Sequence, residues 1–240
     1  MPRFFINYVP EEQAVITGED ARHIARSLRM QPGESLILCD SIGTDYNGRI
    51  ESIADNESVV RVLNFCRSVT EPGVNVTVYQ GLPKADKMDS IVQKSVETGA
   101  VKIVPVLTAR CVSRPDEKAA AKKNTRWQKI AEEAAKQSGR GIIPEVGTLT
   151  DFRAAVKQAA QSGEIILFFE GGGQSIAELV NRQTGELAVF IGPEGGFEQA
   201  EVDFAVQNGA RIGTLGARIL RTETAPIAAL SAIMLATGNM

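Results

Sequence analysis

The sequence contains little cysteine and almost no histidine. The cysteines, Cys39, Cys66 and Cys111, are isolated from one another. They therefore indicate neither a disulfide framework nor a zinc site with CxxC spacing, and a reducing cytoplasm suits them. His23 is the single histidine of the chain. This argues against a Ser-His-Asp hydrolase and against a histidine-rich metal centre, so we expect no bound metal.

Long apolar runs are also missing. No stretch reaches the roughly 18 apolar residues that a membrane-spanning helix needs. The N-terminal MPRFFINYVP lacks the apolar core and the small-residue cleavage pattern of a signal peptide. We therefore expect a cytoplasmic protein that does not associate with membranes.

Positive charge is concentrated in one part of the chain. The net charge is −3, which by itself argues against nucleic-acid binding. However, residues 84–140 carry thirteen Lys and Arg against seven Asp and Glu, whereas residues 1–70 and 141–240 are each net negative. The basic segment could form a face for nucleic acid. The alternative is an ordinary solvated helix surface, and the sequence leaves both open.

The pattern of elements changes near residue 70. Residues 1–70 contain five short β-rich pieces and one helix, ARHIARSLRM, which together predict a small barrel. From residue 74 onward, apolar strands alternate with helices, which predicts an α/β domain with a parallel sheet. One of these helices is expected to begin at Asn124 or Thr125 as N-cap and to end before Gly139.

Three strand ends in this second region lead into glycine-containing loops. They are Gly171 to Gly173, Gly192 to Gly196, and Leu215 with Gly216. Ligands of parallel sheets bind beyond the carboxyl ends of the strands, where glycine allows close approach to the backbone. Each glycine taken alone could simply serve a turn. Three such loops together favour a binding site, and the lack of GxGxxG or GxxxxGK[ST] argues against a nucleotide-phosphate site.

The segment after the last of these loops, GARILRTETAPIA, is unusually polar for the entrance to a buried helix. Arg218 and Arg221 stand three apart, and Glu223 follows. Thr222 or Thr224 could cap the helix, with Glu223 near its positive end. Helix capping accounts for the threonines and for Glu223 better than it accounts for Arg221.

Together, IGPEGGF and LGARILRTETA resemble the ribosomal RNA small-subunit methyltransferase E family, which lies within the trefoil-knotted SPOUT class. The resemblance extends along nearly the whole chain. It includes RHIARSLRMQPGESLILCD, LPKADKMDSIVQKSVETGAVKIVPVLTARCVSR and RWQKIAEEAAKQSGRGIIPEV. The C-terminal pair of motifs is its most specific part.

The resemblance implies an N-terminal PUA-like β-barrel over residues 1–70 that binds RNA, and a knotted α/β methyltransferase domain over residues 74–240. It also implies a homodimer and S-adenosylmethionine as cofactor. The implied substrate is N3 of a uridine in 16S ribosomal RNA, either free or in the small subunit. Patterning alone predicts an ordinary open sheet and no knot. The apolar final helix, APIAALSAIMLAT, suits either core or dimer interface, and the resemblance favours interface.

The expected reaction needs an activated nucleophile, because uridine N3 carries a proton. Loss of that proton develops negative charge on the uracil carbonyls, which Arg221 could stabilise. Arg221 is not the base, since a guanidinium keeps its proton. Glu194 or Glu223 could accept the proton directly or through water, and the sequence does not choose between them.

Binding residues follow from the loops and from the basic helix. Apolar walls and backbone groups would hold the cofactor, at Glu170, Gly171, Ile191, Gly192, Pro193, Glu194, Gly196, Leu215, Gly216, Arg218, Ile219, Leu220 and Ala225. Arginines spaced four and three apart on one helix face suit phosphate. The expected RNA contacts are Arg3, Arg22, His23, Arg26, Arg29, Lys84, Lys87 and Lys94.

Two other functions remain open at this stage. One is a SPOUT enzyme that methylates tRNA or a ribose 2′-oxygen. The other is a non-catalytic RNA-binding protein of ribosome assembly that has kept the fold.

Overall fold

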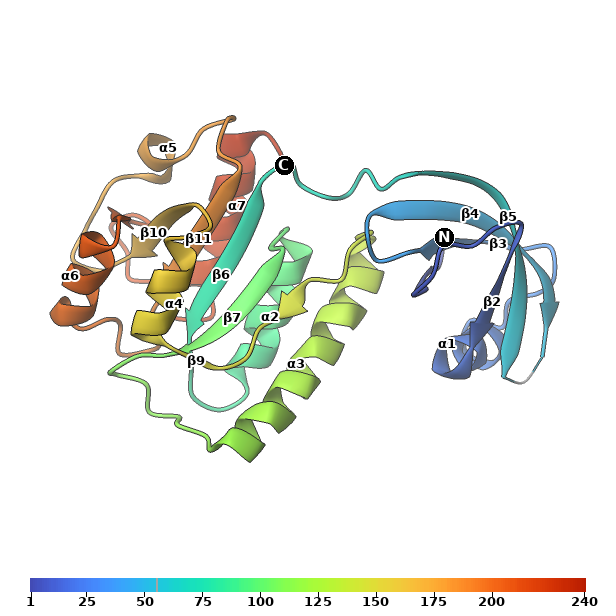
Figure 1. Cartoon of the computed structure of the whole chain (residues 1–240), viewed down its shortest axis with the longest axis horizontal. Coiled ribbons are helices and arrows are strands. Elements are labelled where there is room, and N and C mark those ends of the chain that lie inside the picture. The colour runs from blue at the N-terminus through green and yellow to red at the C-terminus, as the bar shows by residue number, and fades with distance from the viewer. Residues whose placement is uncertain (55) are drawn as a thin grey trace. The chain divides into compact units, whose positions relative to one another are not determined.

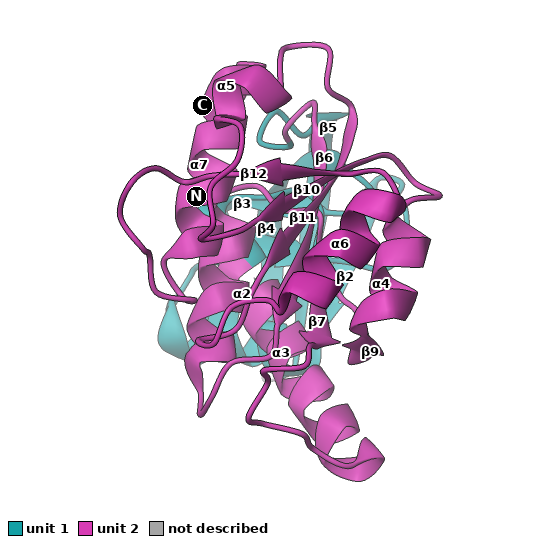
Figure 2. Ribbon diagram, turned by 90° about the vertical axis from the view of Figure 1, so that its left-hand side faces the viewer, with its two compact units in different colours: residues 1–71, 135–143 teal, residues 72–134, 144–240 magenta. Residues whose placement is uncertain are grey.

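The computed structural model describes residues 1–54 and 56–240, and it divides into two compact units (Figure 2). Unit 1 comprises residues 1–71 and 135–143, and unit 2 comprises residues 72–134 and 144–240. Residues 135–143, which the sequence assigned to the second domain, group with unit 1. There Lys136 Nζ lies 3.1 Å from Asp20 Oδ1, and the buried Arg140 pairs with Glu71 at 2.6 Å.

Unit 1 is built on a five-stranded sheet in the order β1-β3-β4-β5-β2 (Figure 1). Its strands are β1 (Arg3–Phe5), β2 (Gln13–Thr17), β3 (Ser35–Cys39), β4 (Thr44–Ile53) and β5 (Glu57–Arg67). The β1–β3 pair is parallel and the other pairs are antiparallel. Within the described residues no ladder joins β1 to β2, so the sheet is an open form of the predicted barrel.

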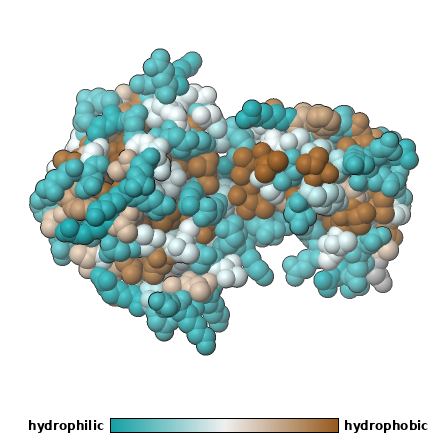
Figure 3. Space-filling view, viewed as in Figure 1, coloured by the Kyte–Doolittle hydropathy of each residue, from teal (hydrophilic) through white to brown (hydrophobic). Residues whose placement is uncertain are grey.

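The core of unit 1 follows from the alternation of its strands. In β2, Ala14 and Ile16 point inward between exposed neighbours, and in β3 Leu36 and Leu38 are fully buried. Helix α1 (Gly18–Arg22), continued by the π-helical turn η1 (His23–Ser27), adds the buried Ile24. On the face drawn in Figure 3, apolar side chains form several patches among hydrophilic ones.

Arg3 lies inside unit 1 and not on a basic surface. Its guanidinium makes a two-pronged contact with the carboxylate of Asp45, at 2.6 and 2.9 Å, and also donates to Cys39 Sγ. Both side chains of the ion pair are about nine-tenths buried, with 8% and 11% exposed. Burial, reinforced by Asp45, raises the pKa of the Cys39 thiol to about 12. The buried pair with Asp45 leaves little of the Arg3 side chain exposed for the expected contact with RNA.

Unit 2 is built on a parallel sheet in the order β12-β10-β11-β6-β7-β8, with β9 also paired to β7. Its strands are β6 (Asn75–Gly81), β7 (Lys102–Leu107), β8 (Glu145–Val146), β9 (Thr150–Asp151), β10 (Glu164–Phe168), β11 (Glu186–Ile191) and β12 (Ala210–Gly213). The inner strands are apolar on both faces because helices cover both faces of the sheet. This confirms the predicted parallel α/β architecture.

Helices pack on both faces of this sheet (Figures 1 and 2). They are α2 (Lys87–Glu97), α3 (Glu117–Ser138), α4 (Phe152–Ala159), α5 (Ile176–Leu179), α6 (Gln199–Gln207) and α7 (Ala225–Thr237). Helices α4 and α6 cover one face, where Tyr79 and Phe190 stack with ring centroids 4.5 Å apart. Helix α7 contacts α2, α5 and β6. None of the helices of the described chain is long and apolar enough to cross a membrane.

Helix α3 begins earlier than the sequence predicted. It starts at Glu117, so Asn124 and Thr125 lie within the helix and do not cap it. The EKAAAKK stretch consists of strong helix formers, which extend the helix toward its N-terminus. The Asn124 amide donates instead to the carbonyls of Val146 and Gly147. The predicted end before Gly139 is confirmed, since Gly139 has φ +76°.

Loss of the buried ion pair of unit 1 should lower the free energy of unfolding more than loss of an exposed pair. We expect Arg3→Met to lower the free energy of unfolding by about 3–5 kcal/mol, because it leaves Asp45 buried without its partner. The matched control is Arg61→Met, which breaks the pair with Glu51 where the Arg61 side chain is 64% exposed. It should cost less than about 1 kcal/mol. Urea unfolding of the full chain measures both, and equal losses would contradict the assignment.

Candidate functional site

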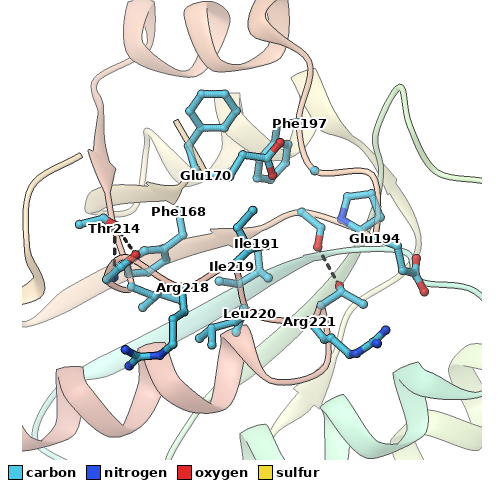
Figure 4. A pocket seen from close by; sticks show the side chains of 18 of the residues that line it. Phe168, Glu170, Ile191, Glu194, Phe197, Thr214, Arg218, Ile219, Leu220 and Arg221 are labelled. Carbon is cyan, nitrogen blue, oxygen red and sulfur yellow. Dashed lines mark hydrogen bonds between the residues drawn. The ribbon is translucent and has the colours of Figure 1, made fainter. Parts of the chain in front are cut away.

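A pocket of about 290 Å³ opens in unit 2 at the carboxyl ends of β10, β11 and β12. Figure 4 shows the side chains that line it. Of the thirteen residues expected to bind the cofactor, the pocket brings together twelve, and only Gly171 is outside its lining. The lining also includes residues that the sequence did not single out for it: Lys87, Phe168, Phe169, Phe197, Thr214, Ala217, Arg221 and Thr222.

The loop after β11 forms the floor of this pocket with its backbone. Gly196 N–H donates to Pro193 O at 2.9 Å, which closes a tight turn. Gly196 has φ +66°, and a Cβ there would lie 2.6 Å from Glu170 Oε2. The positive φ favours glycine at this position, whereas the Glu170 carboxylate is the end of a flexible side chain that could turn away. Gly196 therefore serves the shape of the pocket as well as the turn.

The segment after β12 forms an opposing apolar wall. Thr214 and Gly216 exchange hydrogen bonds at 3.2 and 3.4 Å, which hold the turn after the strand. Ile219 and Leu220 follow, and Ile219 is 84% exposed although it lines the pocket. An apolar ligand group in the pocket would cover it.

The side chains of the two arginines in this segment point in different directions. In Figure 4, Arg221 extends on the side of the pocket where Glu194 lies, whereas Arg218 extends on the side of Thr214. Within the described residues, Arg221 has no ion-pair partner. Its carbonyl accepts from Thr224 N–H and Ala225 N–H at the start of α7. The Arg221 backbone thus takes part in the turn that leads into α7, and Arg221 lines the pocket.

A lysine holds both candidate proton acceptors. Lys87 Nζ lies 3.1 Å from Glu194 Oε1 and 3.1 Å from Glu223 Oε2, so one ammonium group bridges the loop after β11 and the segment after β12. The Lys84 N–H also donates to the Glu194 carboxylate. The expected contact of Lys87 with RNA therefore conflicts with its place in this ion-pair cluster, which lies at the pocket.

The cluster keeps its acids ionised. Burial raises the pKa of Glu194, but backbone N–H groups and Lys87 outweigh burial, so the net pKa is below the ordinary value. Its own backbone N–H and Lys87 likewise lower the pKa of Glu223. Hydrogen bonds to Glu223 and Glu194 raise the pKa of Lys87. All three groups are charged at neutral pH.

The expected RNA-contact residues of unit 1 are arranged differently from a regular helix face. Arg22, His23 and Arg26 are exposed on α1 and η1. Arg29 is exposed too, but it lies beyond the end of the helical turn with φ +52°. The prediction of one helical face is therefore wrong for Arg29, because the π-helical turn changes the spacing and the chain then leaves the helix.

The remaining lysines lie in unit 2. Lys94 pairs with Glu97 one turn later on α2, at 2.7 Å, and so is partly neutralised. Lys84 is exposed beside the pocket loop. Within the described chain, no group of three or more His, Cys, Asp or Glu side chains is placed to hold a metal ion.

Comparisons with known proteins cover both units. A family of RNA methyltransferase domains matches residues 70–234, and a family of RNA methyltransferase PUA domains matches residues 16–63. The chain is 37% identical to ribosomal RNA small subunit methyltransferase E of Bacillus subtilis, over 97% of this chain and 96% of that protein. It is 31% identical to the protein of the same description in Mycobacterium bovis, over 98% and 92% of the two chains.

A solved structure agrees with these sequence matches. It is the crystal structure of a ribosomal RNA small subunit methyltransferase E from Neisseria gonorrhoeae bound to S-adenosyl methionine. Its TM-score to this chain is 0.88 at 31% identity, and the match covers 98% of this chain and 97% of the other. The similarity thus extends over the fold of both units.

The shared ammonium of the pocket predicts a specific pH dependence of stability. We expect Lys87→Met to raise the pKa of Glu194 and Glu223 toward the ordinary carboxyl range, because both lose their counter-charge. The wild type should then be the more stable protein at neutral pH. Its advantage should shrink as the pH falls through the carboxyl range, where its acids become protonated, and as it rises through the raised pKa of Lys87.

Urea unfolding as a function of pH measures this difference. The control is Lys129→Met on α3, an exposed lysine far along the chain from the pocket loops. A wild-type advantage that stays constant from about pH 3 to about pH 8 would show that the bridge does not control these acids.

Proposed function

The chain belongs to the ribosomal RNA small-subunit methyltransferase E family, and from that premise we propose that it methylates N3 of a uridine in 16S ribosomal RNA. The observation that carries this proposal is the pocket in which IGPEGGF and LGARILRTETA meet, with Arg221 at its edge. The cofactor is S-adenosylmethionine. The substrate is small-subunit ribosomal RNA, free or assembled, which is consistent with a cytoplasmic enzyme.

The residues of the pocket suit this cofactor. Ile191, Leu215 and Leu220 offer apolar walls for a flat base, and the glycine loop leaves backbone groups near the ligand. A side chain on Gly196 would fill the floor and strike Glu170. Glu170 lines the pocket and can accept hydrogen bonds from ribose hydroxyls. When bound, the sulfonium supplies a methyl group that is already activated for transfer.

The chain's own residues prepare the uridine. N3 becomes a nucleophile when it loses its proton, and the negative charge then spreads to the uracil carbonyl oxygens. Arg221 stabilises that charge, since its guanidinium extends from the pocket wall and makes no ion pair within the described chain, although its charge helps to lower the pKa of Glu223. Glu194 or Glu223 accepts the proton, directly or through water. Both are carboxylates at neutral pH, since backbone N–H groups and Lys87 lower a pKa that is already acidic, so both can accept.

RNA is held by exposed basic side chains of both units. In unit 1 these are Arg22, Arg26 and Arg29, with His23 beside them. Arginine suits phosphate because its planar group donates two parallel hydrogen bonds. In unit 2 Lys84 adds a positive charge beside the pocket loop.

The homodimer and the knot are further parts of the proposal. Along one face of α7, positions 227, 228, 231, 232 and 235 are small or apolar and only partly buried, and Leu235 is 68% exposed. Such a face suits an interface between two copies. The hydrogen bond from Thr222 to Gly192 O, at 2.8 Å, packs the segment after β12 against the loop after β11. The proposed knot itself rests on the membership of the family.

Mapping of methyl groups on 16S ribosomal RNA tests the substrate directly. RNA from cells with and without this gene is digested and compared by mass spectrometry. We expect one uridine to lose a single methyl group in the absence of the gene. Unchanged uridines, or a loss from tRNA or from a ribose 2′-oxygen, would contradict the assignment. Calorimetric titration of the protein with S-adenosylmethionine separates an enzyme from a non-catalytic assembly protein.

Removal of the Arg221 guanidinium should separate chemistry from binding. We expect Arg221→Ala to bind S-adenosylmethionine within about three-fold of the wild-type Kd and to transfer methyl groups about 10²–10³-fold more slowly at saturating cofactor. Arg182→Ala is the control, an exposed arginine outside the pocket. If Arg221→Ala loses cofactor binding instead, Arg221 is a cofactor or structural residue.

A further inference from the structure

A buried amide lies directly behind the pocket. Gln80 is fully buried near the carboxyl end of β6, opposite Ile191 of β11 on one side and Pro105 of β7 on the other. It does not line the pocket. Its Nε2 donates toward Gly81 O at 3.0 Å, Thr222 Oγ1 at 3.0 Å and Gly192 O at 3.3 Å. Nε2 carries two protons for these three acceptors, and the two acceptors outside β6 lie on Gly192 and Thr222.

Thr222 completes this network. Its side chain is also buried, and its hydroxyl donates to Gly192 O at 2.8 Å, the hydrogen bond drawn beside Arg221 in Figure 4. A hydroxyl has a single proton, so Thr222 Oγ1 accepts from Gln80 while it donates to Gly192. The donors run in one direction, from Gln80 to Thr222 and on to the Gly192 carbonyl.

The oxygen of the Gln80 amide, Oε1, indicates why the hydrogen bonds from Nε2 are important. Its Oε1 is buried and has no hydrogen-bond partner within the described residues. An unpaired buried acceptor costs stability, and an apolar side chain of similar size at this position would avoid that cost. The neighbours of Gln80 in the sheet interior are apolar. The hydrogen bonds from Nε2 therefore explain why a glutamine occupies this position, and packing does not.

The groups that it holds belong to the two loops of the site. Gly192 begins the turn of the IGPEGGF loop, and Thr222 directly follows Arg221 in the chain. The end of β6 also touches this loop closely, since a Cβ on Gly81 would lie 2.5 Å from Pro193 Cδ and 2.6 Å from Pro193 N. The cofactor loop and the Arg221 segment are thus fastened to the same strand end.

We infer that Gln80 and Thr222 are positioning residues for methyl transfer, which set the separation between the cofactor loop and the guanidinium of Arg221. The inference rests on the proposed use of this pocket by S-adenosylmethionine. Neither residue takes part in the chemistry. Their shared acceptor, Gly192 O, makes the two loops move together, so a cofactor that orders one loop also orders Arg221.

The test compares substitutions that remove or keep the hydroxyl. Thr222→Val removes it with little change of shape, and Thr222→Ser keeps it. We expect Thr222→Val to raise the Kd for S-adenosylmethionine about five-fold and to lower kcat at saturating cofactor at least about ten-fold. Thr222→Ser should stay within about three-fold of the wild type in both quantities.

A second variant and a matched control complete the experiment. Gln80→Met removes the amide and should lower kcat in the same way. Combined with Thr222→Val it should lose no more than the worse single variant, because the two residues act as one unit. The control is Thr237→Val, another buried threonine whose hydroxyl donates to a backbone carbonyl at 2.8 Å, at the far end of α7. It should leave Kd and kcat unchanged.

Several results would overturn the inference. One is wild-type Kd and kcat in folded Thr222→Val or in Gln80→Met, with folding checked by thermal melting. Another is a Thr222→Ser protein as impaired as Thr222→Val, which would show that retaining the hydroxyl does not retain the activity. Should Thr222→Val fail to fold, Gln80→Met alone decides. A wild-type protein that does not bind S-adenosylmethionine would overturn the proposed function itself, which is a separate outcome.

Discussion

The carbonyl oxygen of Gly192 accepts hydrogen bonds from Thr222 and from Gln80, and the arrangement of the site depends on this buried contact. It joins the loop after β11, the segment after β12 and the end of β6, three parts of the chain that are far apart in sequence. The parallel sheet brings their strand ends to one edge, and the hydrogen bonds hold the loops there at a fixed distance. The pocket wall and the Arg221 guanidinium both extend from segments that these hydrogen bonds join.

Charge is distributed by the fold in a way that the net value of −3 does not reveal. Several basic side chains are used within the protein: Arg3 in the core of unit 1, Arg140 against Glu71, and Lys87 between two acids of the pocket. Other cations stay exposed on α1 and η1. The same residue types therefore serve stability in one place and suit RNA phosphate in another, according to burial and the nearest carboxylate.

Much of the architecture could be predicted from local pattern. Buried parallel strands are apolar on both faces, so runs such as EIILFF and LAVFIG can be recognised as strands from the sequence. Glycines such as Gly139 likewise indicate where a helix ends. Where local signals compete, the prediction failed. Asn124 is a good N-cap residue, but the alanines and lysines before it extend α3 to Glu117. Arg29 fits a helical spacing with Arg22 and Arg26, but a π-helical turn breaks that spacing.

The sequence by itself determined the parallel α/β class, the β-rich N-terminal region and two of the three glycine loops, the ones that begin at Gly192 and Leu215 and line the pocket. Strand burial and backbone freedom are local properties, which is why local pattern reveals them. Only the tertiary structure decided which charges meet. Arg3 and Asp45 are 42 positions apart, and Lys87 meets Glu194 and Glu223 across more than a hundred. Gln80 gave no signal in the sequence, since its importance comes from Gly192 and Thr222, two partners more than a hundred positions away. A contact between distant residues is fixed by how the strands are ordered in the sheet, and that order follows from the packing of the whole domain.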